Sequence, residues 1–118
     1  MANPFTYLEL HSTDTGKARA FYSELFGWKT DEIAVPGGSY TEIHTHEGPP
    51  AGLTAQRQPQ AGSAWLAYVR VPRLDEAVSR AEKLGGRVIT PRTEIKEGAF
   101  AVLQDPSGAS IGVFEKAG

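Results

Sequence analysis

The feature that most constrains this fold is an internal repeat. Each half of the chain begins with an alternating strand pattern, at Phe5–His11 and at Trp65–Val71, and continues with an amphipathic helical pattern that stops at glycine. Superposing Leu25–Gly27 on Lys83–Gly85 corresponds to a shift of 58 residues. A copy of roughly 50 residues is too small to bury a core alone. We therefore predict that the two copies pack together around a cavity.

The first copy, about residues 4–56, is predicted to be a strand, a helix and three further strands. Side-chain oxygens for a helix N-cap come from Ser12, Thr13 and Asp14. The helix is expected to bury a stripe at spacings of three and four, formed by Ala18, Phe21, Tyr22, Leu25 and Phe26. The later strands are expected at Trp28–Val35, Tyr40–Thr45 and Gly52–Gln56. The polar stretch 57–63 is interpreted as a linker.

The second copy, about residues 64–116, repeats this order. Its helix is expected at Asp75–Leu84, with one face formed by Leu74, Val78, Ala81 and Leu84. Its later strands are expected at Arg87–Pro91, Phe100–Gln104 and Ile111–Glu115, with a tight turn at Asp105–Gly108. Residues 1–118 thus form a single α+β domain of two βαβββ modules.

Composition excludes several classes of site and partner. The chain has no cysteine, so disulfides, thiolate nucleophiles and Cys-ligated metals are excluded. A net charge of −2 gives no reason to expect nucleic acid or an anionic membrane as a partner. The N-terminus lacks the pattern of a secretory signal, and no apolar run is long enough to cross a bilayer. We expect a cytoplasmic protein.

Two sets of residues bring a family into view. The first is the string Phe21-Tyr22…Leu25-Phe26-Gly27-Trp28, and the second is Leu84-Gly85-Gly86 followed by Asp105-Pro106-Ser107-Gly108. Together they resemble the vicinal-oxygen-chelate superfamily, which includes glyoxalase I, bleomycin-resistance proteins and extradiol dioxygenases. The resemblance implies cupped mixed sheets with a central cleft, and a homodimer by analogy.

Metal-using members of that superfamily carry four ligands drawn from His, Glu and sometimes Gln. The motifs place the corresponding positions at Tyr7, Leu66 and Gly112, with the fourth near Gly52 or Leu53. One tyrosine without companions does not hold zinc, nickel or iron, which need about three suitable protein donors. We therefore predict no family-type metal and no cofactor.

A different metal site is conceivable at Glu42, His44 and His46, because the spacing permits chelation. The alternative, which we favour, is that these polar residues mark the exposed end and solvent face of a strand. The sequence leaves open whether they hold an adventitious ion.

Alternation of side chains along the strands predicts which residues face the cleft. Leu8, Leu10, Ala67, Val69 and Val71 should face the helices. The expected ligand-binding residues are Tyr7, Glu9, Leu66, Tyr68, Arg70, Phe100, Val102, Gly112 and Phe114, with His11 also turned toward the cleft. Glu9 and Arg70 are predicted to meet across the cavity, where they recognise a charged group of the ligand, or else to form a structural salt bridge that caps the sheet ends. Trp28 and Trp65 are expected to shield the core or a subunit contact.

Three functions remain open. The first is metal-independent binding of a small organic molecule, such as a planar, partly cationic compound, in the cleft. The second is a metal-free lyase, isomerase or hydroxylase-like enzyme in which Glu9 or Tyr68 carries a proton. The third is an interaction module whose cleft serves a partner chain or a dimer seam. We favour the first, and the sequence does not identify the ligand.

Overall fold

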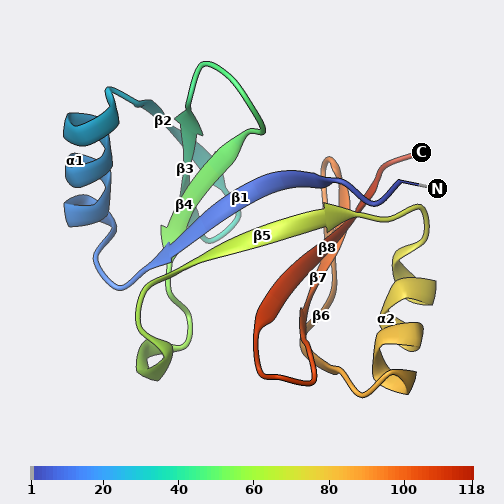
Figure 1. The fold of residues 1–118 in the computed structure, drawn as a ribbon. Coiled ribbons are helices and arrows are strands. Elements are labelled where there is room, and N and C mark those ends of the chain that lie inside the picture. Colours follow the sequence, from blue (N-terminus) through green and yellow to red (C-terminus); the bar gives the residue numbers. More distant parts are fainter. Residues whose placement is uncertain (1) are drawn as a thin grey trace. The chain divides into compact units, whose positions relative to one another are not determined.

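The computed structural model describes residues 2–118, and these residues repeat one order of elements: a strand, a helix and three strands (Figure 1). They form two compact units. One is Tyr7–Leu66, called here the N-terminal unit, and the other joins the stretch up to Thr6 with Ala67–Gly118, called the C-terminal unit. The repeated order confirms the predicted α+β fold of two βαβββ modules. The central cleft was predicted between the two modules, and it stays a prediction.

The N-terminal unit contains a mixed sheet whose strands lie in the order β2-β3-β4-β1. Strands β1 and β4 are parallel, whereas β2 with β3 and β3 with β4 are antiparallel. The elements are β1 (Phe5–Ser12), α1 (Thr15–Phe26), β2 (Lys29–Val35), β3 (Gly38–His44) and β4 (Ala51–Ala55). A short 3-10 helix, η1 (Pro59–Ala61), lies within the stretch interpreted as a linker.

Helix α1 begins and ends where its local chemistry dictates. The Asp14 carboxylate accepts a hydrogen bond from the backbone N–H of Lys17 at 3.0 Å, which satisfies one of the free donors of the first turn. Gly27 adopts a left-handed conformation with φ of 72°, and its N–H donates to the carbonyl of Ser23. Asp14 is therefore the N-cap among the three residues that the sequence offered.

Helix α1 packs on the sheet through a narrow row of residues, Ala18 and Tyr22. They contact a core cluster, joined by Trp28, whose buried members are Leu10, Ile43, Ala51 and Leu53. The wider stripe predicted from the sequence was wrong at Phe21, Leu25 and Phe26, which are each more than half exposed. Residues that flank the contact row of a short helix reach solvent, although they share its apolar periodicity.

The C-terminal unit contains the other four strands, in the order β5-β8-β7-β6. Strands β5 and β8 are parallel, and the other neighbours are antiparallel. The elements are β5 (Ala64–Arg70), α2 (Leu74–Lys83), β6 (Arg87–Ile95), β7 (Gly98–Gln104) and β8 (Ser110–Lys116). This order repeats that of the N-terminal unit, because in each unit the first strand is parallel to the last.

Helix α2 covers one face of this sheet, with Leu74 fully buried at its start. Val78 and Ala81 pack against the same cluster, which includes Ala99, Ala101, Leu103 and Val113. Of the residues expected beside the helix, Val71 joins this cluster, whereas Ala67 and Val69 are half-buried. The prediction was wrong at Leu84, which is 66% exposed because it follows the last helical residue and caps the helix with its backbone N–H.

Strand β6 continues to Ile95, beyond the end predicted at Pro91. Proline has no N–H to donate to a neighbouring strand, so it normally ends or bulges a strand. Here the pairing with β7 shifts register between Thr90 and Thr93, so that the ladder resumes after the proline. Because β6 lies at the edge of the sheet, the missing donor breaks no pairing on its outer side.

The predicted turn after β7 is held by the side chain of Asp105. Its carboxylate accepts hydrogen bonds from the N–H and hydroxyl of Ser107, at 2.8 and 2.6 Å, and from the N–H of Ala109 at 3.1 Å. These bonds, the Ser107 hydroxyl above all, lower the pKa of Asp105 because they stabilise its charged form.

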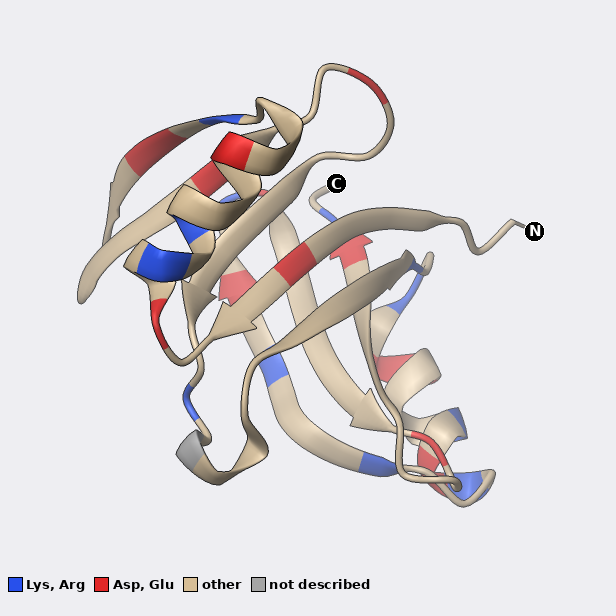
Figure 2. Cartoon of the chain, turned by 60° about the vertical axis from the view of Figure 1, so that its left-hand side comes forward, with Lys and Arg blue, Asp and Glu red and all other residues tan. Residues whose placement is uncertain are grey.

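Charged residues of both signs occur on both helices (Figure 2). Within residues 2–118, no helix combines the length and the apolar character that a membrane span needs.

Candidate functional site

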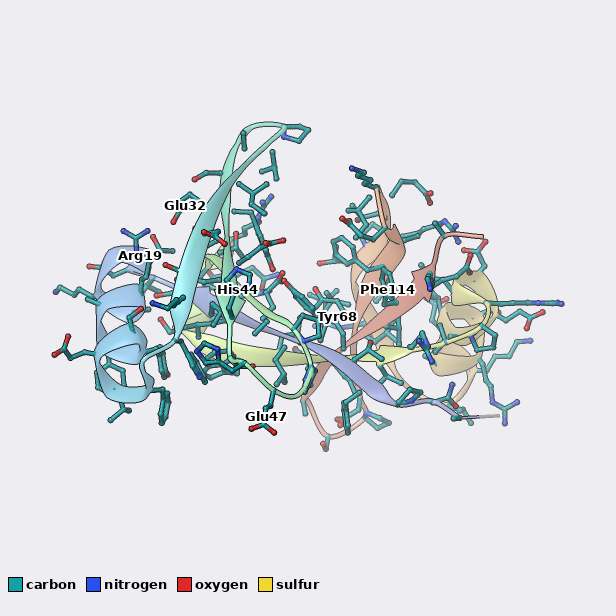
Figure 3. All side chains as sticks on the ribbon, turned by 90° about the horizontal axis from the view of Figure 1, so that it is seen from above. Arg19, Glu32, His44, Glu47, Tyr68 and Phe114 are labelled. Carbon is teal, nitrogen blue, oxygen red and sulfur yellow. The ribbon has the colours of Figure 1, made fainter. Side chains whose placement is uncertain are left out.

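Each sheet has one face covered by its helix and one face that the helix leaves uncovered. In the N-terminal unit, Thr41 lies on the covered face, where its hydroxyl and the guanidinium of Arg19 both donate to Glu32 at 2.7 Å (Figure 3). Because neighbours along a strand alternate, Asp31 and Glu42 lie on the uncovered face. The strand register aligns four residues there, in the order Glu9, Gly52, Glu42 and Asp31.

A hydrogen-bonded group of two tyrosines, a carboxylate and a histidine occupies this uncovered face. The hydroxyl of Tyr40 donates to one oxygen of Glu9 at 2.6 Å and lies 2.5 Å from the hydroxyl of Tyr7. The other Glu9 oxygen lies 2.7 Å from Nε2 of His11. The structure therefore brings together three residues predicted to face the cleft, and it adds Tyr40.

Tyr40 is the residue that the sequence reasoning missed. Its strand alternates Tyr40, Glu42 and His44 on one face, and this pattern was the available signal. Burial raises the pKa of Tyr40, and the negative charge of Glu9 raises it further. The Tyr40 hydroxyl accordingly stays protonated at neutral pH and acts as a donor to the carboxylate.

Gly52 lies directly beneath these hydroxyls. A Cβ atom at Gly52 would overlap the hydroxyls of both Tyr40 and Tyr7, so any side chain at this position would displace them. Leu53, the neighbouring candidate for the fourth ligand position, points the other way and belongs to the core beside α1. Gly52 is thus the residue of this pair that faces Tyr7.

The corresponding face of the C-terminal unit carries six of the predicted ligand-binding residues in two rows. The first row is Tyr68, Gly112 and Val102, and the second is Arg70, Phe114 and Phe100. They share the face opposite α2, because the alternate positions Ala101 and Val113 pack in the helix-covered core. Tyr68 and Val102 are buried, whereas Phe100 and Phe114 are half-buried.

Tyr68 fills the space above Gly112. A Cβ atom at Gly112 would overlap the Tyr68 ring, which also packs edge-on against Phe100 with ring centroids 6.0 Å apart. Tyr68 holds the same register position in its sheet as Glu9 does in the first sheet, since each lies opposite the glycine of its parallel partner strand. The two residues proposed from the sequence as proton carriers are therefore structural counterparts.

The positions that correspond to the superfamily's metal ligands do not supply a donor set. Gly52 and Gly112 have no side chain, and tyrosines fill the space where one would stand. Leu66 is a buried hydrocarbon, and the hydroxyl of Tyr7 is engaged with Tyr40. One phenol does not match the three or more nitrogen, oxygen or sulfur ligands that a zinc or iron centre needs. These residues do not fit a family-type metal.

Arg70 lies at the end of β5, where it lines an open hollow of about 240 Å³ together with Ala2, Val71, Pro72 and Lys116. Its backbone N–H donates to the carbonyl of Pro4, and its side chain is exposed. The predicted pairing of Glu9 with Arg70 joins the two units and stays a prediction.

Trp28 and Trp65 lie in an aromatic cluster around Tyr22. The Tyr22 ring stacks on Trp28 and meets Trp65 edge-on, and the indole N–H of Trp65 donates to the Tyr22 hydroxyl at 3.2 Å. Leu10 and Ile43 join Trp28 around a space of about 10 Å³ beneath α1, room for about one water molecule. Trp28 packs against this core, whereas Trp65 is 40% exposed and contacts Tyr22 and Trp28.

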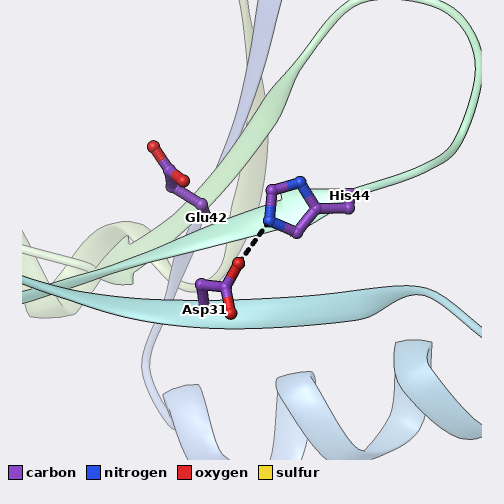
Figure 4. A group of neighbouring side chains, drawn as sticks. All are labelled: Asp31, Glu42 and His44. Atoms are coloured by element: carbon purple, nitrogen blue, oxygen red, sulfur yellow. Dashed lines mark hydrogen bonds and ion pairs between the residues drawn. The ribbon is translucent and has the colours of Figure 1, made fainter.

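The structure regroups the second candidate metal site. Among residues 2–118, Asp31 joins Glu42 and His44, and one ligand atom from each lies within 4.8 Å of the others (Figure 4). Nε2 of His44 is 2.7 Å from an Asp31 oxygen. His46 lies outside this group, in the turn after β3, with a left-handed backbone φ of 75°. The sequence spacing alone could not bring in Asp31, which belongs to the neighbouring strand.

The chain resembles known proteins over nearly its whole length. The model of the glyoxalase-like domain family matches residues 7–114. The Mycobacterium tuberculosis protein named "Putative glyoxylase CFP32" is 31% identical over 92% of this chain, and the anthracycline biosynthesis protein DnrV of Streptomyces peucetius is 31% identical over 93%. The chain spans 44% and 46% of the length of these two relatives.

The fold has a counterpart among solved structures. Methylmalonyl-CoA epimerase from Mycobacterium tuberculosis superposes with a TM-score of 0.71 over 97% of this chain and 88% of that one, at 16% sequence identity. Similarity at that identity establishes the shared fold and not a shared activity. With the family match across both modules, the chain belongs to the glyoxalase-like domain family of the vicinal-oxygen-chelate superfamily.

Proposed function

We propose that this chain binds a small organic molecule without a family-type metal, through the uncovered sheet faces of its two modules. The observation that carries the proposal is that tyrosine side chains fill the space over Gly52 and Gly112, where a side chain at either position would stand. Positions that hold metal ligands in catalytic relatives here present phenol rings and hydroxyls. Recognition then rests on shape, hydrogen bonding and charge.

The polar part of the proposed site is the group around Glu9. A carboxylate accepts hydrogen bonds at several positions and carries a negative charge, so Glu9 suits a ligand hydroxyl or ammonium group. The rings of Tyr7 and Tyr40 are suited to a flat aromatic ligand. In the C-terminal unit, Phe100, Val102 and Phe114 provide apolar surface.

The relatives support a planar aromatic ligand class. DnrV is named for anthracycline biosynthesis, and anthracyclines combine a flat polycyclic ring system with hydroxyl groups and an amino sugar. Such a compound would place an ammonium group against Glu9 and its ring system against aromatic side chains. Because the chain spans less than half of DnrV, this ligand class is our proposal for the domain and not a property transferred from the whole relative.

The test is a fluorescence titration of the EDTA-treated protein with an anthracycline antibiotic. We expect saturable binding without added metal, and we expect Glu9→Gln to weaken it by about tenfold, as for loss of a charge-assisted hydrogen bond. Glu24→Gln, on the exposed surface of α1, is the matched control and should leave affinity unchanged. Binding that appears only after zinc or nickel is added would contradict the proposal.

A second candidate function is metal-free acid–base catalysis, and the Tyr40–Glu9 hydrogen bond favours it specifically. Glu9 would accept a proton from a carbon acid and return it to the carbanion, and the protonated hydroxyl of Tyr40 would stabilise the developing negative charge by donating a hydrogen bond. Tyr68 is the corresponding proton carrier of the C-terminal unit. This mechanism needs no donor set at Gly52 or Gly112.

Comparing the Glu9→Gln variant with the wild-type chain distinguishes catalysis from binding. If Glu9 is a base, Glu9→Gln abolishes exchange of the ligand's acidic C–H with deuterated solvent, as followed by NMR, while affinity falls little. If the chain only binds its ligand, the wild-type protein catalyses no exchange. The first result would establish an enzyme, and the second would exclude this alternative for that ligand.

We also propose a homodimer, by analogy with the family. The exposed apolar residues Phe21, Leu25 and Phe26 of α1 would gain from being covered. Light scattering after size exclusion measures the assembly directly, and a monomer at high concentration would contradict it.

A further inference from the structure

We propose that Asp31, Glu42 and His44 form a binding site for a divalent transition-metal ion, of which zinc is the representative, on the uncovered face of the β2–β3 hairpin. This site is separate from the superfamily's ligand positions. Glu42 and Asp31 lie two and three strands across the sheet from Glu9, about 10 and 14 Å away by the spacing of successive strands. The site goes beyond the proposed function, which needs no metal.

The backbone brings the three ligands together. Asp31 and Glu42 are directly opposite each other in an antiparallel pair, which sets their Cβ atoms about 5 Å apart. His44 follows Glu42 by two residues on β3. Because side chains alternate along a strand, His44 is therefore the next side chain on the same face. Hydrogen bonds between β2 and β3 fix this register, so the convergence does not depend on a chance rotamer.

The ligand atoms already lie close to metal-binding separations. Nε2 of His44 is 2.7 Å from an Asp31 oxygen, and the three ligand atoms lie within 4.8 Å of one another (Figure 4). Bonds of about 2.0–2.2 Å to a tetrahedral zinc ion place ligand atoms about 3.3–3.6 Å apart. All three side chains reach solvent, so the small rotations needed to enclose an ion meet little resistance from packing.

The chemical types suit zinc better than magnesium or calcium. The imidazole nitrogen is a ligand that transition metals prefer, and zinc accepts carboxylate oxygens beside it, whereas calcium and magnesium favour all-oxygen sites. Three protein ligands leave a coordination position for water. The two carboxylates also balance the ion's charge.

An ordinary surface ion pair is the competing explanation for these contacts. The Asp31–His44 pair alone would be such a contact, since both side chains are well exposed and exposed pairs contribute little to stability. The third ligand distinguishes the two explanations. Glu42 is superfluous in the pair but necessary for a three-ligand site, so its contribution to metal affinity is diagnostic. Lys29 on β2 is paired with His44 on β3. Its positive charge would repel a bound metal ion and lower the affinity modestly.

The chain provides its own controls, because it contains only three histidines. Untagged protein is stripped with EDTA, dialysed, and titrated with zinc by calorimetry, with cobalt absorption as a second readout. We expect one zinc ion per chain, and we expect His44→Gln and Glu42→Gln each to weaken binding by about tenfold or more. His46→Gln and His11→Gln should bind zinc as the wild-type chain does. Circular dichroism checks that each variant is folded.

Two results would overturn the proposal. One is the absence of saturable zinc binding to the wild-type chain. The other is an affinity that falls as much in His46→Gln or His11→Gln as in His44→Gln, which would place the ion elsewhere. Ligand binding is measured separately on EDTA-treated protein, so failure of the metal site leaves the test of the proposed function unaffected.

Discussion

The aromatic ring of Tyr68 lies over Gly112, its partner across the parallel pair of β5 and β8, and fills the space that a side chain at Gly112 would need. The hydroxyls of Tyr40 and Tyr7 stand over Gly52 in the same way in the other unit. In both units a tyrosine and a glycine are complementary, and each glycine lies where the resemblance to the superfamily predicts a metal-ligand position. This relationship links the missing ligands to the packing of the site.

The first prediction is that Gly112→Ala destabilises the protein by about 2 kcal/mol, because the new Cβ atom forces the Tyr68 ring out of a well-packed position. Urea denaturation measures the change. Gly16→Ala is the control, since its Cβ would meet its nearest neighbour, an oxygen of Asp14, at 3.7 Å. We expect that variant to be neutral or slightly stabilising.

The Tyr68 contact itself is tested by a double variant. If the ring causes the penalty, Gly112→Ala should cost much less in a Tyr68→Ala background than in the wild-type chain. An undiminished cost would show that the backbone of β8, and not the ring, rejects a side chain at Gly112.

The second prediction concerns alkaline pH. Burial and Glu9 raise the pKa of Tyr40 above its ordinary value of 10.0, so the folded state binds a proton that the unfolded state releases. This contribution to stability is fully present below about pH 10 and is lost as the pH rises further. Tyr40→Phe should therefore lose stability less steeply than wild type at alkaline pH, as measured by the urea midpoint. Tyr7→Phe, which keeps the Tyr40–Glu9 bond and removes only the smaller contribution of Tyr7, should give a curve between those of Tyr40→Phe and wild type.

The third prediction concerns the core beneath α2. Leu74 is fully buried, so Leu74→Ala leaves a cavity and should lower the free energy of unfolding by about 3 kcal/mol. Leu84→Ala, at the exposed end of the same helix, should change it by less than about 0.5 kcal/mol. Equal effects in chemical denaturation would contradict the assignment of Leu74 to the core and Leu84 to the surface.

The fourth prediction concerns acid pH. Hydrogen bonds, first of all from the Ser107 hydroxyl, lower the pKa of Asp105 in the folded state. The resulting stability is present above the ordinary pKa of an aspartate and is lost as the pH falls through the folded value. Asp105→Asn should make the melting temperature fall less steeply on acidification, and Ser107→Ala should reproduce part of that change. If the melting temperature fell equally steeply with pH in wild type and both variants, this role of the turn would be contradicted.

Much of the fold could be predicted because it depends on local patterns. The alternation in Phe5–His11, the helix stop at Gly27 and the repeat of both after 58 residues indicated two βαβββ modules. The turn at Asp105 could be predicted because its hydrogen bonds join residues close together in the sequence. Where a tertiary contact decides, local patterns failed. Apolar spacing placed Phe21 and Leu25 in the core, although α1 contacts its sheet only through a narrower row.

The sequence by itself determined the modules, the alternation that turns Tyr7, Glu9 and Tyr68 away from the helices, and the loss of donor residues at the superfamily's ligand positions. Only the tertiary structure decided which side chains meet: Tyr40 with Glu9, and Asp31 with His44. The physical reason is that side-chain direction along a strand is local, with a period of two, whereas register between strands is set by hydrogen bonds joining residues far apart in the chain.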